Sequence, residues 1–168
     1  MSATHTFVLD TNVFVEAARR YYAFDIAPLF WEELVRQANA RRIISIDRVK
    51  YELDLGKDEL AKWANGHFQA YFDSTADETV VNAYCEIMVW ANQQMQFNDE
   101  AKADFAKGDN ADPWVVAYAK AKGCVVVTHE QFDNRIRRKI PIPNVCQAFS
   151  IPYVDTFEML RQVGVTFK

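Results

Sequence analysis

Apolar residues follow two kinds of pattern along the chain. Short runs that contain almost no polar residues predict buried strands, because a strand covered on both faces needs apolar side chains at nearly every position. These runs are FVL at residues 7–9, RIISI at 42–46, CVVVT at 124–128 and the shorter IPYVD at 151–155.

Between these runs, apolar residues recur every three or four positions, as in helices with one buried side. Asp47 and Asp58 precede two of these helices as caps, while Gly56 and Gly66 are expected to end them. The predicted helices cover residues 12–22, 28–42, 48–56, 57–66, 77–95, the first part of 99–111, 112–123 and 156–164. Residues 67–75 are expected as a loop with some extended character, and residues 133–144 as a basic loop.

The alternation of strands and helices predicts an α/β fold of three layers, with a central, mostly parallel sheet between two layers of helices. Ligand sites in such folds lie at the carboxyl ends of the strands. Asp10 directly follows the first strand. Glu130 comes two residues after Thr128, the last residue of the strand predicted at 124–128. Both acids are therefore expected at the same edge of the sheet.

Two further acids are candidates for this edge. Glu52 lies one turn into the helix that follows the strand at 42–46, and Asp112 opens the helix that leads into the strand at 124–128. Carboxylates close together repel one another, and a divalent cation removes that conflict. Oxygen ligands favour Mg²⁺ or Mn²⁺, and such a centre suits hydrolysis of a phosphodiester bond.

Each acid also has an ordinary structural explanation. Asp10, followed by Thr11 and Asn12, suits a helix N-cap, and Asp112 before Pro113 suits one equally well. Glu52 alone resembles a solvated helix position. Only the order of the acids relative to the strands and helices favours a shared site over these alternatives.

Composition limits the classes of protein that fit. The 168 residues are 50% apolar and 14% aromatic, so we expect residues 1–168 to form a single domain with a substantial core. A formal net charge of -4 argues against binding nucleic acid by bulk attraction, so any such contact must be local. Three widely spaced cysteines predict reduced thiols, and the absence of a signal peptide or long apolar run predicts a cytoplasmic protein without a membrane segment.

Four segments together resemble PIN-domain proteins, the nuclease fold of VapC-like toxins and of several RNA-processing enzymes. They are FVLDTNVF at 7–14, SIDRVKYEL at 45–53, NADPWVVAYAKAKGCVVVTHE at 110–130 and IPNVCQAFSIPYVDTFEMLRQVG at 142–164. The resemblance implies a PIN-like fold with acids that bind Mg²⁺ or Mn²⁺ at one end of the sheet. It further implies hydrolysis of RNA, restraint by an antitoxin protein, and a homodimer.

The resemblance assigns the catalytic and metal-binding roles to Asp10, Glu52, Asp112 and Glu130. It gives supporting roles, orienting the acids or a water molecule, to Thr11, Asn12 and Thr128. The last motif departs from the family, which commonly has Thr-x-Asp where this chain has Thr-His-Glu. Asp133 is therefore a rival to Glu130, and Asp109 is close enough in sequence to join the site.

Basic residues near these motifs are candidates for binding substrate phosphates. Arg135, Arg137 and Arg138 follow Glu130, and Arg19 precedes Tyr21, whose ring could stack on a base. A solvated loop or an antitoxin contact explains the same residues equally well.

Two other functions stay open at this point. A structure-specific DNA nuclease would use a similar carboxylate cluster, although this chain lacks long basic insertions. A non-catalytic PIN module that binds RNA or protein would be expected to have lost acids, and here all four positions hold one.

Overall fold

The structure of the protein, a computed structural model, describes residues 5–167. A five-stranded parallel sheet lies at its centre, in the order β3-β2-β1-β4-β5. The predicted parallel α/β architecture is therefore confirmed. The strands are β1 (Phe7–Leu9), β2 (Ile43–Ile46), β3 (Phe72–Asp73), β4 (Val125–Val127) and β5 (Tyr153–Val154).

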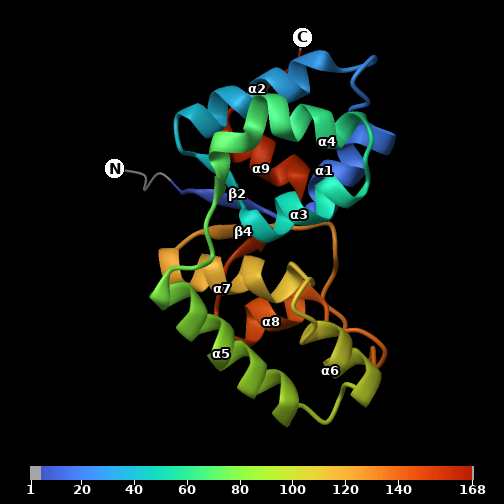
Figure 1. Cartoon of the computed structure of the whole chain (residues 1–168), viewed down its shortest axis with the longest axis vertical. Helices are drawn as coiled ribbons and strands as arrows, with labels where there is room; N and C mark the ends of the chain where they lie inside the picture. Colours follow the sequence, from blue (N-terminus) through green and yellow to red (C-terminus); the bar gives the residue numbers. More distant parts are fainter. Residues whose placement is uncertain (1–4, 168) are drawn as a thin grey trace.

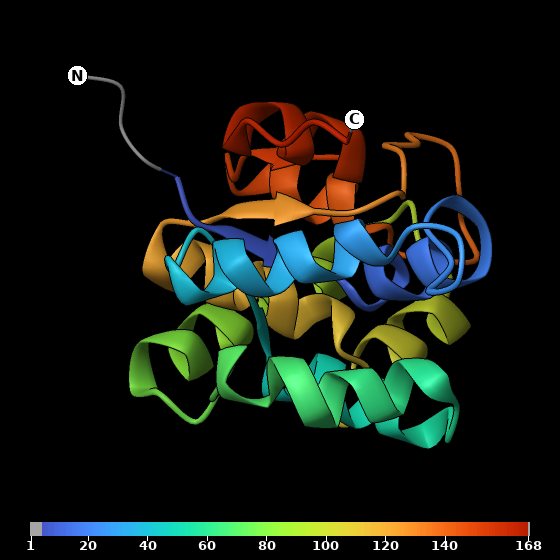
Figure 2. The same ribbon diagram turned by 90° about the horizontal axis from the view of Figure 1, so that it is seen from above.

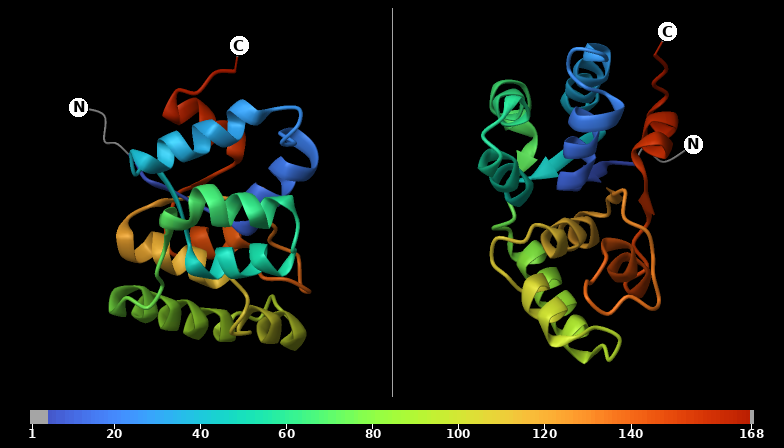
Figure 3. Two further views of the ribbon diagram at one scale, coloured as in Figure 1. Left: turned by 45° about the horizontal axis from the view of Figure 1, so that its top comes forward. Right: turned by 90° about the vertical axis from the view of Figure 1, so that its right-hand side faces the viewer.

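Helices cover both faces of this sheet (Figure 1). Helices α1 to α4 and α9 form one layer, and α5 to α8 form the other, as the side view shows (Figure 3, right). Seen from above, α2 and α4 run side by side in the first layer (Figure 2). The helices are α1 (Thr11–Glu16), α2 (Pro28–Asn39), α3 (Asp47–Leu55), α4 (Glu59–Trp63), α5 (Glu78–Gln93), α6 (Asp99–Phe105), α7 (Asp112–Lys122), α8 (Ile142–Ala148) and α9 (Thr156–Val163), with the π-helices η1 (Ala17–Tyr21) and η2 (Ala64–Phe68) and the 3-10 helix η3 (Gln69–Tyr71).

The strand order explains where a site can form. The chain passes from β1 through β2 to β3 on one side of the sheet, and from β4 to β5 on the other. The connections therefore diverge between β1 and β4, which pair in parallel with Leu9 opposite Val127. Crevices open at the carboxyl ends of strands where connections diverge in this way. Asp10 and Thr128 come directly after these two strands.

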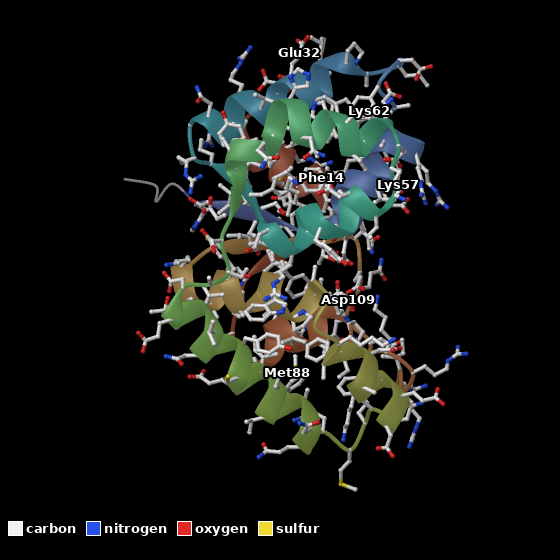
Figure 4. The ribbon with its side chains drawn as sticks, viewed as in Figure 1. Phe14, Glu32, Lys57, Lys62, Met88 and Asp109 are labelled. Atoms are coloured by element: carbon white, nitrogen blue, oxygen red, sulfur yellow. The ribbon has the colours of Figure 1, made fainter. Side chains whose placement is uncertain are left out.

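The core confirms the interpretation of the apolar runs. Every residue of β1, β2 and β4 is buried, as expected for strands covered on both faces. Phe14, which Figure 4 labels, packs in the first layer against three aromatic rings, those of Trp63, Phe68 and Phe72. None of the helices in the part of the chain described is long and apolar enough to cross a membrane.

Several sequence-based expectations about local structure were wrong. Asp47 does not cap α3 but is its first residue, and its carboxylate accepts hydrogen bonds from Thr75. The helix expected to end at Gly66 continues through it as η2. The segment expected as a loop with some extended character contains the two-residue strand β3. The basic loop expected at 133–144 ends in the first turn of α8, which continues to Ala148.

Candidate active site

Asp10 stands at the N-cap position of α1, but its side chain does not cap the helix. The side chain is 1% exposed. Its Oδ2 accepts a hydrogen bond from Thr128 Oγ1 at 3.2 Å. Its Oδ1 is buried and has no hydrogen-bond partner within residues 5–167. A buried carboxylate oxygen without a partner costs free energy unless it binds a proton or a cation. A helix-capping role therefore does not explain Asp10.

Glu52 reaches the same edge of the sheet from α3. Thr11 Oγ1, in the first turn of α1, donates to Glu52 Oε1 at 2.8 Å and so fixes the carboxylate. Burial raises the pKa of Glu52, and the nearby charge of Asp109 raises it further, against the lowering effect of its hydrogen bonds. Glu52 is therefore a partly buried acid turned toward other acids and is not a solvated helix position.

Asp112 opens α7, the helix that packs beneath the sheet and leads into β4. Its backbone N–H donates to Asn110 Oδ1 at 3.0 Å. Ala111, and not Asp112, occupies the N-cap position of α7, so the expected capping role of Asp112 was wrong. Burial, and then the charge of Glu130, raise the pKa of Asp112 to about 7. A pKa this high shows that the ionised carboxylate is both desolvated and crowded by other acids.

The four predicted acids act on one another. Burial raises the pKa of Asp10 well above its ordinary value, and the charges of Asp112 and Glu130 raise it further, with a smaller contribution from Glu52. The hydrogen bond from Thr128 opposes this rise only in part. Such mutual repulsion requires short distances in a poorly solvated place. The structure thus brings the four acids to one edge of the sheet.

The ammonium group of Lys139 lies beside these acids. It pairs with Glu130 Oε1, while Glu130 Oε2 accepts from the backbone N–H of Ile142 at 2.7 Å. Burial lowers the pKa of Lys139, but the bond to Glu130 and the charges of Asp112 and Asp10 outweigh this effect and raise it overall. Lys139 belongs to the basic loop that was predicted as a candidate for binding substrate phosphates, but its pairing with Glu130 was not predicted.

Asp133, the rival for the fourth acidic position, has a different role. Its Oδ1 accepts from the backbone N–H groups of Arg135 at 2.8 Å and Ile136 at 3.1 Å, as in a turn. It is exposed, and its charge does not contribute to the raised pKa of Asp10 or Asp112. The structure therefore favours Glu130.

An open groove of about 480 Å³ runs past Glu52 and Asp112 between α3, α6 and the loop before α8. Figure 4 shows Asp109 at this junction, between α3 and α6. Three basic side chains line the groove beside the acids, those of Lys107, Arg138 and Lys139. The other predicted basic residues are exposed and do not line it; they are Arg19, Arg135 and Arg137.

Arg48 fixes the position of the loop that carries Asp109. Its Nη1 donates to the carbonyl of Gly108 at 2.8 Å, and its Nε donates to Thr75 Oγ1 at 3.2 Å. Its guanidinium also lies 4.3 Å from the ring centroid of Trp114 on α7, within the range of a cation–π contact. Arg48 thereby ties α3 to the start of α7. No sequence motif indicated this role, since it depends on contacts between distant segments.

The acids fit a divalent cation by their chemistry. Their ligating atoms are carboxylate oxygens, which suit Mg²⁺ or Mn²⁺, and Asp10 Oδ1 is a buried oxygen without a partner. As the side chains stand, however, no three Asp, Glu, His or Cys residues in the described part converge closely enough to hold an ion. Glu130 is instead engaged by Lys139. Binding of a cation would therefore require the Glu130–Lys139 pair to rearrange.

A family model described as "Domain of unknown function (DUF4411)" matches residues 7–167. The protein belongs to this family. The search of curated proteins found no match to this sequence.

Two solved structures resemble the structure of this protein over most of their length. VapBC2 from Rickettsia felis, bound to a DNA fragment from their promoter, is 15% identical, with a TM-score of 0.53 over 89% of this chain and 98% of that chain. FitAcB from Neisseria gonorrhoeae is 17% identical, with a TM-score of 0.55 over 88% and 96%. At these identities the likeness establishes the fold, and it confirms the PIN-like fold predicted from the motifs.

Proposed function

We propose that this DUF4411 protein is a metal-dependent endoribonuclease that cleaves RNA through an ion held by Asp10, Glu52, Asp112 and Glu130. The observation that carries the proposal is the mutual crowding of four acids at the point where the sheet connections diverge, with one buried oxygen of Asp10 left without a partner. A protein gains nothing in stability from such an arrangement, because the charges repel and are desolvated. Function is the better explanation.

The residues of the site have distinct roles in this proposal. A bound Mg²⁺ or Mn²⁺ would supply positive charge that activates water and neutralises the phosphodiester as it is cleaved. Thr128 and Thr11 hold the carboxylates of Asp10 and Glu52 in place through their hydroxyl groups. Arg138, on the wall of the groove, is placed to bind a phosphate of the substrate.

A partner protein belongs to the same proposal. The four sequence motifs resemble those of VapC-like toxins, and the two similar structures are of VapBC2, bound to a DNA fragment, and of FitAcB. We infer that this protein is the toxin of a toxin–antitoxin module, that an antitoxin restrains it, and that it forms a homodimer. Co-expression with the protein encoded next to it, followed by purification on a tag carried by that neighbour, would test the antitoxin.

Cleavage assays test the enzymatic part of the proposal. Purified protein is incubated with tRNA, ribosomal RNA fragments and single-stranded DNA, in Mn²⁺, in Mg²⁺ and in EDTA. We expect cuts in RNA that need the metal, and a loss of about 100-fold or more in Asp10→Asn and Asp112→Asn, because each variant removes a charged ligand.

A matched control separates this loss from a general effect of removing a negative charge. Asp104→Asn makes the same change on an exposed residue that lines the same groove, and it should cut like the wild type. Cutting that survives both Asp10→Asn and Asp112→Asn would refute the proposal. Cutting of DNA alone would favour the DNA nuclease, and RNA binding without cutting would favour the non-catalytic module.

A further inference from the structure

A second, smaller hollow lies beside the acids. It has a volume of about 220 Å³ and is lined by Asn12, Glu16, Tyr21, His129 and Glu130. Pockets for drug-sized ligands begin near roughly 300 Å³, so this hollow suits a single planar ring. Its wall includes Glu130, whose partner Lys139 lines the groove. The hollow and the groove therefore adjoin on either side of the Glu130–Lys139 pair.

The ring of Tyr21 is an exposed aromatic surface held rigidly in place. It is 49% exposed, although it contacts rings from two other parts of the chain. Phe157 of α9 meets it edge-on with centroids 5.3 Å apart, and His129 lies 5.9 Å away. His129 is itself fixed, since its Nε2 is hydrogen-bonded to the buried Thr156 Oγ1 at 2.8 Å. A braced, exposed ring can bind a ligand at little cost in conformational entropy.

The backbone beneath Tyr21 also departs from a regular helix. Tyr21 ends η1, a π-helix that directly continues α1, the helix that follows Asp10. Turns of π-helix are rare and occur frequently at functional sites, since they redirect side chains that a regular helix would place elsewhere. Here the turn ends at Tyr21 over the hollow, with Arg19 and Arg20 exposed on the same turn.

We propose that Tyr21 forms a stacking subsite for one unpaired nucleobase of an RNA strand whose phosphates lie along the adjoining groove. The proposal rests on the function proposed above and adds to it a contact for one unpaired base. The base stacks on the outer face of Tyr21, because a ring inserted between two others needs roughly 7 Å and the Tyr21 and His129 centroids are only 5.9 Å apart. The amide of Asn12, in the same hollow, can hydrogen-bond the edge of that base.

A binding assay that does not depend on cleavage tests this subsite. A fluorescein-labelled oligouridylate of about eight nucleotides, within the usual range of single-strand sites, is titrated with the Asp112→Asn protein, and Kd is read from anisotropy. Introducing Tyr21→Ala into the Asp112→Asn protein should weaken binding about ten-fold or more, the typical effect of losing one stacked base. A second oligonucleotide carrying 2-aminopurine should lose fluorescence on binding only when Tyr21 is aromatic.

Three further variants make the test specific. Tyr21→Leu keeps an apolar side chain against Phe157 but has no aromatic face, so it should bind as weakly as Tyr21→Ala. Tyr21→Phe keeps the ring and should bind within about two-fold of the parent. Tyr51→Ala removes another exposed tyrosine, 53% exposed on α3, and should also leave binding within about two-fold.

The outcomes separate the subsite from the nuclease. An unchanged Kd in Tyr21→Ala and Tyr21→Leu would overturn the subsite and would favour a contact between Tyr21 and a partner protein. Failure of the parent protein to bind the oligonucleotide would also overturn the subsite. Binding that depends on the Tyr21 ring, in a protein whose wild type never cuts RNA, would support the subsite and refute the nuclease. Metal-dependent cutting of RNA by a wild type whose Tyr21 variants bind RNA with unchanged Kd would support the nuclease and refute the subsite.

Discussion

Replacing Asp112 by asparagine should make the metal-free protein more stable. The pKa of Asp112 is raised from 3.8 to about 7, first by burial and then by the charge of Glu130. At about 1.4 kcal/mol for each pKa unit, ionised Asp112 costs the folded protein about 4 kcal/mol relative to the unfolded chain. Asparagine has the same shape and no charge. We expect the free energy of unfolding to rise by about 2–4 kcal/mol at pH 8. The rise is smaller than the full cost of the charge because Lys139 loses one of its acidic neighbours.

The gain should depend on pH in a defined direction. Because the pKa of Asp112 is higher in the folded protein than in the unfolded chain, both states hold the proton below pH 3.8 and ionisation then costs nothing. Between pH 3.8 and about 7 the unfolded chain releases its proton first, so this contribution to the stability of the wild type falls as pH rises. The advantage of Asp112→Asn should therefore grow across this window and level off above it.

Urea unfolding in EDTA at about pH 4, 6 and 8 measures this effect. In a chain of this size the expected gain corresponds to a rise in Tm of about 5–15 °C at the highest pH. Asp104→Asn, an exposed acid paired with Lys107, should change stability by less than about 0.5 kcal/mol at every pH. If Asp112→Asn is no more stable than the wild type at pH 8, the carboxylate is not crowded as described and the reasoning fails.

Three other changes test separate parts of the structure. Lys139→Met removes the ammonium beside Glu130, so Tm in EDTA at pH 8 should fall and added Mn²⁺ should raise it more than in the wild type; an unchanged Tm would contradict the pairing. Arg48→Ala should cost about 1–3 kcal/mol in urea unfolding through two lost hydrogen bonds and the cation–π contact, and Lys at this position should not restore the loss. Gly123→Ala should cost about 1 kcal/mol because Gly123 has a φ of 70°, and equal stability would show that the turn relaxes freely.

Local sequence patterns predicted most of the fold. The strands β1, β2 and β4 were predicted because each is an apolar run buried on both sides, a property that the residues carry themselves. The long helix α5 was predicted from the periodicity of its apolar residues, and the αL end of α7 was predicted from Gly123. Both signals are also local to the sequence. The two-residue β3 was predicted only as some extended character within a loop, since it is a strand only through its pairing with β2.

The helix α8 was missed because Pro141 and Pro143 stand at its start. Prolines next to a basic segment suggest a loop, yet Pro143 occupies the first turn, where no backbone N–H is needed. Asp47 was assigned to a cap because its neighbours in sequence suit one. In the structure it binds Thr75, which is distant in sequence, and propensity cannot indicate such a partner.

The order of acids along the chain was sufficient to predict that Asp10, Glu52, Asp112 and Glu130 share one edge of the sheet, because parallel strands place their carboxyl ends together. Only the tertiary structure decided that Lys139 pairs with Glu130, that Arg48 ties α3 to α7, and that the buried oxygen of Asp10 has no partner in the part of the chain described. The physical reason is the range of the interactions. Periodicity and capping act between neighbours in sequence, whereas charge pairing and desolvation depend on how distant segments pack.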